Sequence, residues 1–384
     1  MRRLLPALLI AALPGTLQAQ AHNGAFVVRL GRDTIAVERF SRNGSEYSVE
    51  QVRRVPNTTL WHTHIGLDSS GAVGEIFLMN HSIERMDAPL ITSTRLVAGG
   101  DSATVESKRG DSTRTRRLVV GGDAIPALPQ SFLPYEMAAI RLRLAGGDSS
   151  TFTFLTPSGD TSSVVVRRVG ADSMTFQLPF TTYRARVDAE GRIASLFQPL
   201  GTTVQRVPTV DVNRIAKAWK ALDAAGKGMG PLSPYDSTTA RLGAAKVTVR
   251  YSRPRARGRV VPGNLIPYDQ VWRTGANAAT VLETDRDLVI GTTPVPAGRY
   301  TLFTISTRTG STLVVSKETT RDGQPLAGTD YDQKQDLARI PMTTRTIATP
   351  VDKLTIAVVP TRANEGTLRV VWGPREMTVP VRTR

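Results

Sequence analysis

The segment YSRPRARGRVVPGNLIPYDQVWRTGANAATVLETDRDLVIGTTPVPAGRYTLF, residues 251–303, sets the architecture of the second half of the chain. It begins with the end of a strand and an Arg-rich loop. A turn framed by Pro and Gly, the hexapeptide WRTGAN and two further strands follow. Similar short strand-like runs recur up to residue 372, with almost no helical periodicity. This pattern predicts a β-sandwich or jelly-roll-like domain over 235–384.

The motifs of this segment resemble a known bacterial family. YSRP, VWRTGAN and PAGRYTLF stand in the order and spacing of the domain of unknown function 2911. The resemblance is strong over 251–303 and weak after about residue 316. Because that family is uncharacterised, the resemblance implies a domain and an exported protein but no activity.

Residues 22–208 predict an antiparallel β meander. Runs rich in Val, Ile, Thr and aromatic residues alternate with turn signals such as Asn43-Gly44. A turn of the form Gly-Asp-Ser or Gly-Asp-Thr recurs at Gly100, Gly110, Gly147 and Gly159, which favours repeated hairpins. The hairpin 183–197 loosely resembles those in the curved sheets of periplasmic lipid or lipoprotein carriers.

Residues 209–234 predict a helix followed by a linker. In VDVNRIAKAWKALDAA, residues 210–225, the apolar side chains recur at three- and four-residue steps, and Asp211 or Asn213 can cap the start. The sequence GKGMGPLSP that follows is a Gly/Pro linker. The expected fold class is therefore all-β, with two antiparallel β domains joined by one amphipathic helix and this linker.

The N-terminus predicts export. Arg2 and Arg3 precede a short apolar run, and Ala19-Gln20-Ala21 fits a cleavage site, so residues 1–21 read as a signal peptide. No later run is long enough to span a bilayer, and the absence of Cys leaves no lipid-anchor site. We therefore expect a soluble protein, periplasmic or secreted, without stable membrane insertion.

The formal net charge of +16 allows a polyanion partner, but an Arg-biased, solvated surface is the favoured explanation. Nucleic acid is not expected, because the chain is exported and only 6% of its residues are aromatic.

Motifs of the common hydrolases and phosphate-binding loops are absent from the sequence. His62 and His64 share one face of a predicted strand, and His81 follows a second strand, which allows a metal site. Two histidines on a half-exposed sheet need no metal, and Asp330, Asp332 and Asp336 read as a solvated acidic loop. We expect neither metal nor cofactor.

The remaining constellation lies in the quoted segment. The forked guanidinium group of Arg recognises anions such as carboxylate or phosphate, and a neighbouring aromatic ring can stack on a sugar. The predicted ligand contacts are Arg253, Arg255, Arg257, Tyr268 and Asn277. A structural role is predicted for Trp272 in the core, for Arg273 on loop carbonyls, and for Gly275 in the turn.

These features favour a binding protein for an anionic or sugar-like small molecule or glycan. One alternative is a hydrolase or lyase acting on an acidic glycan, with Tyr268 or Asp269 as acid or base. The other is a carrier of lipids or lipoproteins that uses the first domain. Three features distinguish these hypotheses. A binding site should be a basic, aromatic patch, and an enzyme should have a buried acid beside Arg. A carrier should have an apolar cavity in the first domain.

Overall fold

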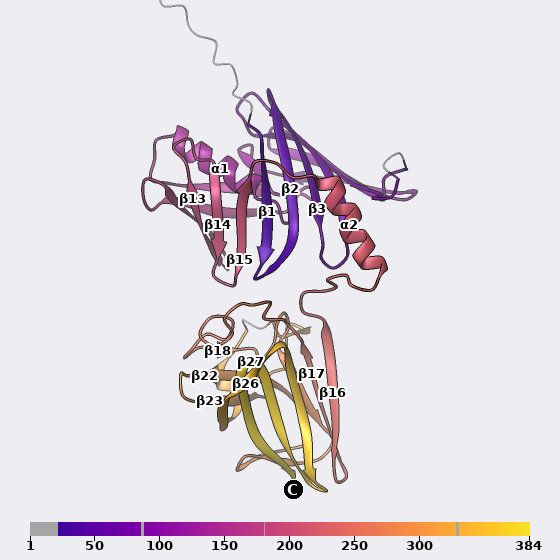
Figure 1. Ribbon diagram of the computed structural model, residues 1–384, viewed down its shortest axis with the longest axis vertical. Helices are drawn as coiled ribbons and strands as arrows, with labels where there is room; N and C mark the ends of the chain where they lie inside the picture. Colours follow the sequence, from indigo (N-terminus) through magenta and orange to yellow (C-terminus); the bar gives the residue numbers. More distant parts are fainter. Residues whose placement is uncertain (1–21, 86–87, 180, 328–329) are drawn as a thin grey trace, which may run out of the picture.

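The computed structural model describes residues 22–85, 88–179, 181–327 and 330–384. The predicted signal peptide, residues 1–21, lies outside the described residues. The architecture is all-β, with one large and mainly antiparallel sheet in each half of the chain, as the sequence predicts (Figure 1). None of the helices in the described part of the chain is long and apolar enough to cross a membrane.

The N-terminal sheet has fifteen strands in the order β8-β7-β6-β5-β4-β3-β2-β1-β15-β14-β13-β12-β11-β10-β9. Neighbours pair antiparallel except β9 and β10, which are parallel. The strands are β1 Gly24–Leu30, β2 Asp33–Asn43, β3 Glu46–Arg53, β4 Thr59–Leu67, β5 Val73–His81, β6 Thr92–Gly99, β7 Ser102–Arg109, β8 Ser112–Val119, β9 Ala124–Pro126, β10 Ser149–Leu155, β11 Thr161–Arg168, β12 Ser173–Leu178, β13 Thr181–Val187, β14 Ile193–Gln198 and β15 Thr202–Val207.

The sheet curves around a helix that the sequence did not reveal. Helix α1, Leu133–Leu144, lies within the curvature (Figure 1), and Leu133, Met137 and Leu142 join the core of the domain. Because α1 is buried over much of its circumference, its apolar residues form no single stripe, and helical periodicity is weak. The expectation of strands alone over 22–208 is corrected by this one helix.

Helix α2, Val212–Ala224, is the helix that the sequence predicts over 210–225. The side chain of Asp211 accepts a hydrogen bond from the backbone N–H of Arg214 at 2.9 Å and caps the helix. Val212 and Ala216 pack on Val37 and Leu60, on the outer face of the sheet. We use "N-terminal domain" for β1–β15 with both helices.

The C-terminal domain, from β16 onward, folds its sheet back on itself. Its strand order is β16-β17-β19-β22-β23-β26-β27-β20-β21, with β18 paired to β22. The long strands β26 and β27 return over β16 and β17, so that Tyr251 packs with Ile356 and Val370 in one core. The elements are β16 Tyr235–Leu242, β17 Ala245–Ser252, β18 Val271–Trp272, β19 Thr280–Thr284, β20 Leu288–Ile290, β21 Thr293–Val295, β22 Gly298–Ser306, β23 Ser311–Ser316, the separate pair β24 Thr320–Arg321 and β25 Gln324–Pro325, the short helix η1 Gln333–Gln335, β26 Asp336–Arg362 and β27 Glu365–Thr383.

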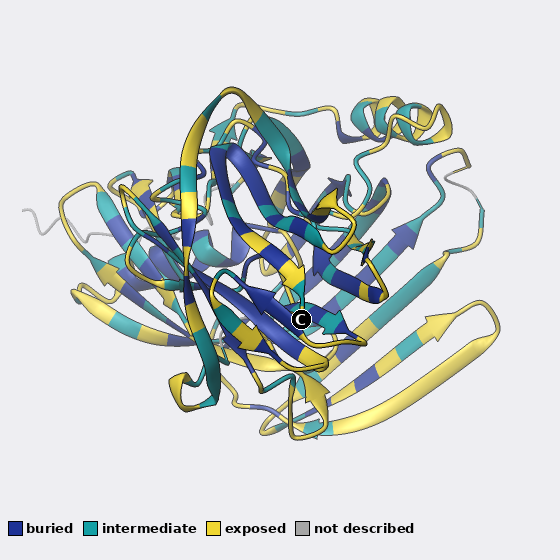
Figure 2. Cartoon of the chain, turned by 90° about the horizontal axis from the view of Figure 1, so that it is seen from below, coloured by how far each residue is buried: buried dark blue, intermediate teal, exposed yellow. Residues whose placement is uncertain are grey.

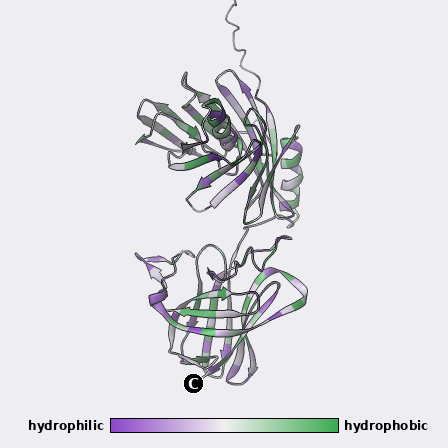
Figure 3. Cartoon of the chain, turned by 90° about the vertical axis from the view of Figure 1, so that its left-hand side faces the viewer, coloured by the Kyte–Doolittle hydropathy of each residue, from purple (hydrophilic) through white to green (hydrophobic). Residues whose placement is uncertain are grey.

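Both domains follow the period-two rule of strands with one buried face. Buried and exposed segments alternate along the strands (Figure 2), and hydrophobic segments are interleaved with hydrophilic ones in both domains (Figure 3). Strand β8 departs from this rule, because nearly all of its residues are exposed at the edge of the N-terminal sheet.

Candidate functional site

The two domains meet through the Arg-rich loop of the quoted segment. Arg257 is buried, and its Nη1 donates to the carboxylate of Asp33 in the N-terminal domain. The backbone N–H of Arg32 donates to the carbonyl of Arg257 at 2.8 Å. Arg259 donates through Nη1 to the carbonyl of Leu200 at 2.7 Å. The loop therefore ties the C-terminal domain to two turns of the N-terminal sheet.

Two glycines make this approach sterically feasible. Gly31 and Gly201 have φ values of 60° and 92°, in the left-handed region. A Cβ at Gly31 would lie 2.2 Å from the carbonyl oxygen of Arg257. A Cβ at Gly201 would lie 2.3 Å from Cδ of Arg259. A side chain at Gly31 would push the loop backbone away from the N-terminal sheet, and one at Gly201 would displace the Arg259 side chain.

A cleft of about 820 Å³ lies beside these contacts, between the two domains. This volume falls in the range of small-molecule sites. The N-terminal domain lines it with Leu30, Tyr183, Gln198, Leu200 and Thr202. The apolar wall from the C-terminal domain comprises Pro254, Leu265, Pro267, Val271, Trp272 and Trp372.

Two stacked indoles form part of that wall. The ring centroids of Trp272 and Trp372 are 5.9 Å apart, and their planes differ by 16°. Trp372 Nε1 donates to the carbonyl of Asp352 at 3.1 Å, and the Asp352 carboxylate accepts from the backbone N–H of Arg257 at 2.8 Å. The cleft wall and the interdomain loop are thus held by one connected set of contacts.

The cleft contains two guanidinium groups and no acid among the described residues that line it. Arg273 is half-buried, and its Nη1 donates to the carbonyl of Asn277. No described carboxylate forms an ion pair with Arg273, and burial without a compensating negative charge lowers its pKa. Burial and the nearby Arg257 also lower the pKa of Arg259, so the cleft favours negative charge.

Arg253 and Arg257, predicted to face a ligand, are instead partnered inside the protein. Arg253 donates to Asp236 at 2.6 Å, to the carbonyl of Leu354 at 2.9 Å and to Thr355. Arg257 is engaged by Asp33, as described above. The Arg253 guanidinium satisfies three protein acceptors and the Arg257 side chain is buried, and neither residue lines the cleft.

Arg255 and Tyr268, also predicted as ligand contacts, lie outside the cleft lining. Arg255 is exposed and lies 3.9 Å from Asp352. The Cζ atoms of Arg308 and Arg375 lie 5.4 and 5.8 Å from the centroid of the Tyr268 ring. Asn277 does line the cleft, beside Arg273.

The WRTGAN turn combines core and cleft residues. Trp272 belongs to the core, and Thr274 and Asn277 have positive φ values of 53° and 58°. Gly275, expected to supply unusual dihedrals, does not have a positive φ. A Cβ there would lie 3.0 Å from Oγ1 of Thr280, so the position favours Gly because of close packing. Arg273, predicted to bond loop carbonyls, donates to the carbonyl of Asn277 and also lines the cleft.

The histidines lie elsewhere, in the N-terminal domain. The rings of His62 and His81 are 4.4 Å apart, and His64 Nε2 lies 2.7 Å from Glu46. No three His, Asp or Glu residues of the described chain come together in an arrangement that would hold a metal ion. Tyr331 of the acidic loop lines the cleft and donates to Asp336 at 2.8 Å.

Comparisons with known proteins identify the C-terminal domain. Residues 233–381 match the DUF2911 family, described as a protein of unknown function. The match confirms the resemblance predicted from the motifs of 251–303 and covers nearly the whole C-terminal domain. No curated protein matches the chain.

Two crystal structures show weak similarity to the chain. A DUF1089 family protein from Pseudomonas aeruginosa has 14% identity and a TM-score of 0.31, covering 42% of this chain and 89% of that one. A β-barrel-like DUF1849 protein from Brucella abortus has 12% identity and a TM-score of 0.33, covering 48% of this chain and 94% of that one. Neither likeness assigns a ligand.

Proposed function

We propose that this protein binds an anionic, partly apolar small molecule in the cleft between its two domains. The observation that carries the proposal is Arg273, a half-buried guanidinium in an aromatic cleft whose described lining contains no carboxylate. A half-buried guanidinium without an acidic partner attracts a negative charge more strongly than a fully solvated one does. The anionic group of the ligand accepts hydrogen bonds from Arg273, and its apolar part lies against the indole wall.

A binding role agrees with the chemistry of the cleft better than catalysis does. The described lining offers apolar surface, amides and hydroxyls, but no acid that could act as a general base. Asp269, the alternative catalytic acid, is exposed, and its backbone N–H donates to the carbonyl of Ser306 at 2.7 Å. Tyr268 contacts two arginines through its ring and does not line the cleft.

The proposal is tested with anilinonaphthalene sulfonate, an aromatic anion that becomes fluorescent in apolar sites. We expect saturable binding to the full-length mature chain, and Arg273→Gln should weaken it by roughly 10- to 100-fold, the range of a charged hydrogen bond. Arg255→Gln is the matched control, because it removes an arginine of the same domain that lies outside the cleft. Equal affinity in wild type and Arg273→Gln would contradict the proposal.

A further inference from the structure

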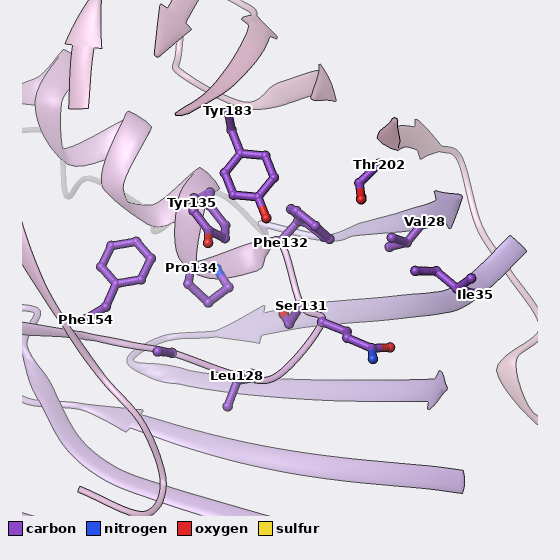
Figure 4. A pocket seen from close by; sticks show the side chains of 12 residues that line it. Val28, Ile35, Leu128, Ser131, Phe132, Pro134, Tyr135, Phe154, Tyr183 and Thr202 are labelled. Atoms are coloured by element: carbon purple, nitrogen blue, oxygen red, sulfur yellow. The ribbon is translucent and has the colours of Figure 1, made fainter. Parts of the chain in front are cut away.

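A cavity inside the N-terminal domain adjoins the cleft. It has a volume of about 250 Å³ and lies between the first turn of α1 and the curved sheet (Figure 4). Tyr183 and Thr202 line both this cavity and the interdomain cleft. These two residues therefore stand at the boundary between a cleft that favours negative charge and the interior of the other domain.

The cavity is apolar over most of its surface. Val28, Ile35, Leu128, Phe132 and Phe154 line it. Its aromatic members touch one another around Tyr135, whose ring centroid lies 5.3 Å from Phe154, 5.4 Å from Tyr183 and 5.6 Å from Phe132.

The polar groups of the cavity are uncharged. No Arg, Lys, Asp or Glu is among the described residues that line it. Burial raises the pKa values of the Tyr135 and Tyr183 hydroxyls, which keeps both neutral. Nothing in this lining recognises charge, so the cavity suits hydrocarbon and disfavours a second anionic group.

We propose that the ligand is a single-chain amphipathic anion, with its carboxylate or phosphate group at Arg273 and its hydrocarbon chain passing Tyr183 and Thr202 into the cavity. This inference rests on the proposed function, since the head group occupies the same cleft. A volume of about 250 Å³ is enough for one hydrocarbon chain, and most of the lining is apolar. Each methylene buried there adds affinity through the hydrophobic effect.

The test is a chain-length series with the full-length mature protein. Butyl, hexyl, octyl and decyl phosphates, and the corresponding alkyl carboxylates, are titrated by calorimetry below their micelle concentrations. We expect affinity to rise by up to roughly fourfold per methylene, which corresponds to about 0.8 kcal/mol. A series that binds with the same affinity at every chain length would overturn this inference and leave the anion site standing. No binding by any member, together with no effect of Arg273→Gln on the sulfonate dye, would refute the proposed function as well.

Two substitutions at neighbouring positions of β15 test whether the alkyl chain of the ligand enters the cavity. Thr202→Phe places a ring at the boundary between cleft and cavity, and we expect the dependence of affinity on alkyl-chain length to flatten. Thr203→Phe is the control, because Thr203 is exposed on the other face of β15. If a folded Thr202→Phe variant gains as much affinity per methylene as the wild type, the proposed path of the alkyl chain is contradicted. If that variant fails to fold, the wild-type series alone still shows whether affinity depends on alkyl-chain length.

Discussion

Arg257 and Asp33 are 224 positions apart in the sequence, yet the guanidinium of one donates to the carboxylate of the other across the domain boundary. The Arg257 side chain is 6% exposed and the Asp33 side chain 31% exposed. Because the same loop continues into the cleft wall, this pair fixes how far apart the two walls of the cleft stand. The binding site proposed here depends on that separation.

Arg257→Ala should therefore loosen the two domains without unfolding either. Loss of a mostly buried charged hydrogen bond costs about 1–3 kcal/mol. We expect trypsin to cut after Lys227, the one basic residue of the Gly226–Pro234 linker, faster than in wild type and to release a folded fragment that begins at Gly228. Asp33→Asn should have a similar but smaller effect. Linker cleavage at the wild-type rate, or a fragment without β-rich circular dichroism, would contradict this prediction.

Trp272→Ala should destabilise the C-terminal domain severely. The indole is 7% exposed and stacks on Trp372, so its loss opens a cavity at a cost of about 3–5 kcal/mol. Arg273→Gln should change stability by only about 0.5 kcal/mol, since a half-buried side chain with one carbonyl partner is lost. Urea unfolding followed by far-UV circular dichroism compares the two variants. A wild-type midpoint for Trp272→Ala would refute the core role of this indole.

Glu38 should make stability depend on pH. Burial raises the pKa of its carboxyl from 4.5 to about 7, with Glu136 adding to the rise. Within this range the folded state binds a proton that the unfolded state has lost, so stability falls as the pH rises from about 4.5 to 7. The total is on the order of 3 kcal/mol, and the charge of the neighbouring Arg53 acts in the opposite direction.

Glu38→Gln should remove this pH dependence. The glutamine keeps an oxygen for the backbone N–H of Phe132, which donates to Glu38 at 2.7 Å at the start of α1. Urea unfolding at pH 5 and pH 8 measures the difference. If the wild type and the variant lose the same stability between the two values, another group is responsible.

We propose that the protein acts outside the cytoplasm after removal of residues 1–21. Mass spectrometry of the native protein should find His22 as the first residue. The His22 side chain then lies at the new terminus, where Nε2 is 2.6 Å from Glu136 and Nδ1 is 2.9 Å from the hydroxyl of Tyr47. A native chain that retains Met1 would contradict export by this route.

The β class, the C-terminal family and helix α2 could be predicted from sequence because each depends on local signals. The alternation of apolar and polar residues in strands, the turn residues, and the helical spacing of Val212, Ala216 and Trp219 can each be recognised within a short stretch of sequence. Helix α1 gave no such signal, because it is buried on several sides.

The candidate site was predicted only in part, because it is built from distant segments. Arg273 and Asn277 were singled out, but their cleft requires Leu200 and Thr202 from the other domain. The partners of Arg253 and Arg257 lie on strands and turns far away in the chain. Local sequence cannot show which guanidinium will find an internal acceptor and which will face a cleft.

The most direct test of the central claim is a crystal structure of the mature protein with decanoate brominated at its terminal carbon. Anomalous scattering locates the bromine independently of the rest of the ligand. The account predicts the carboxylate within hydrogen-bond distance of Arg273 and the bromine among Phe132, Tyr135 and Phe154. A bromine peak only on the outer face of the sheet near Phe197, with the cleft unchanged, would contradict it.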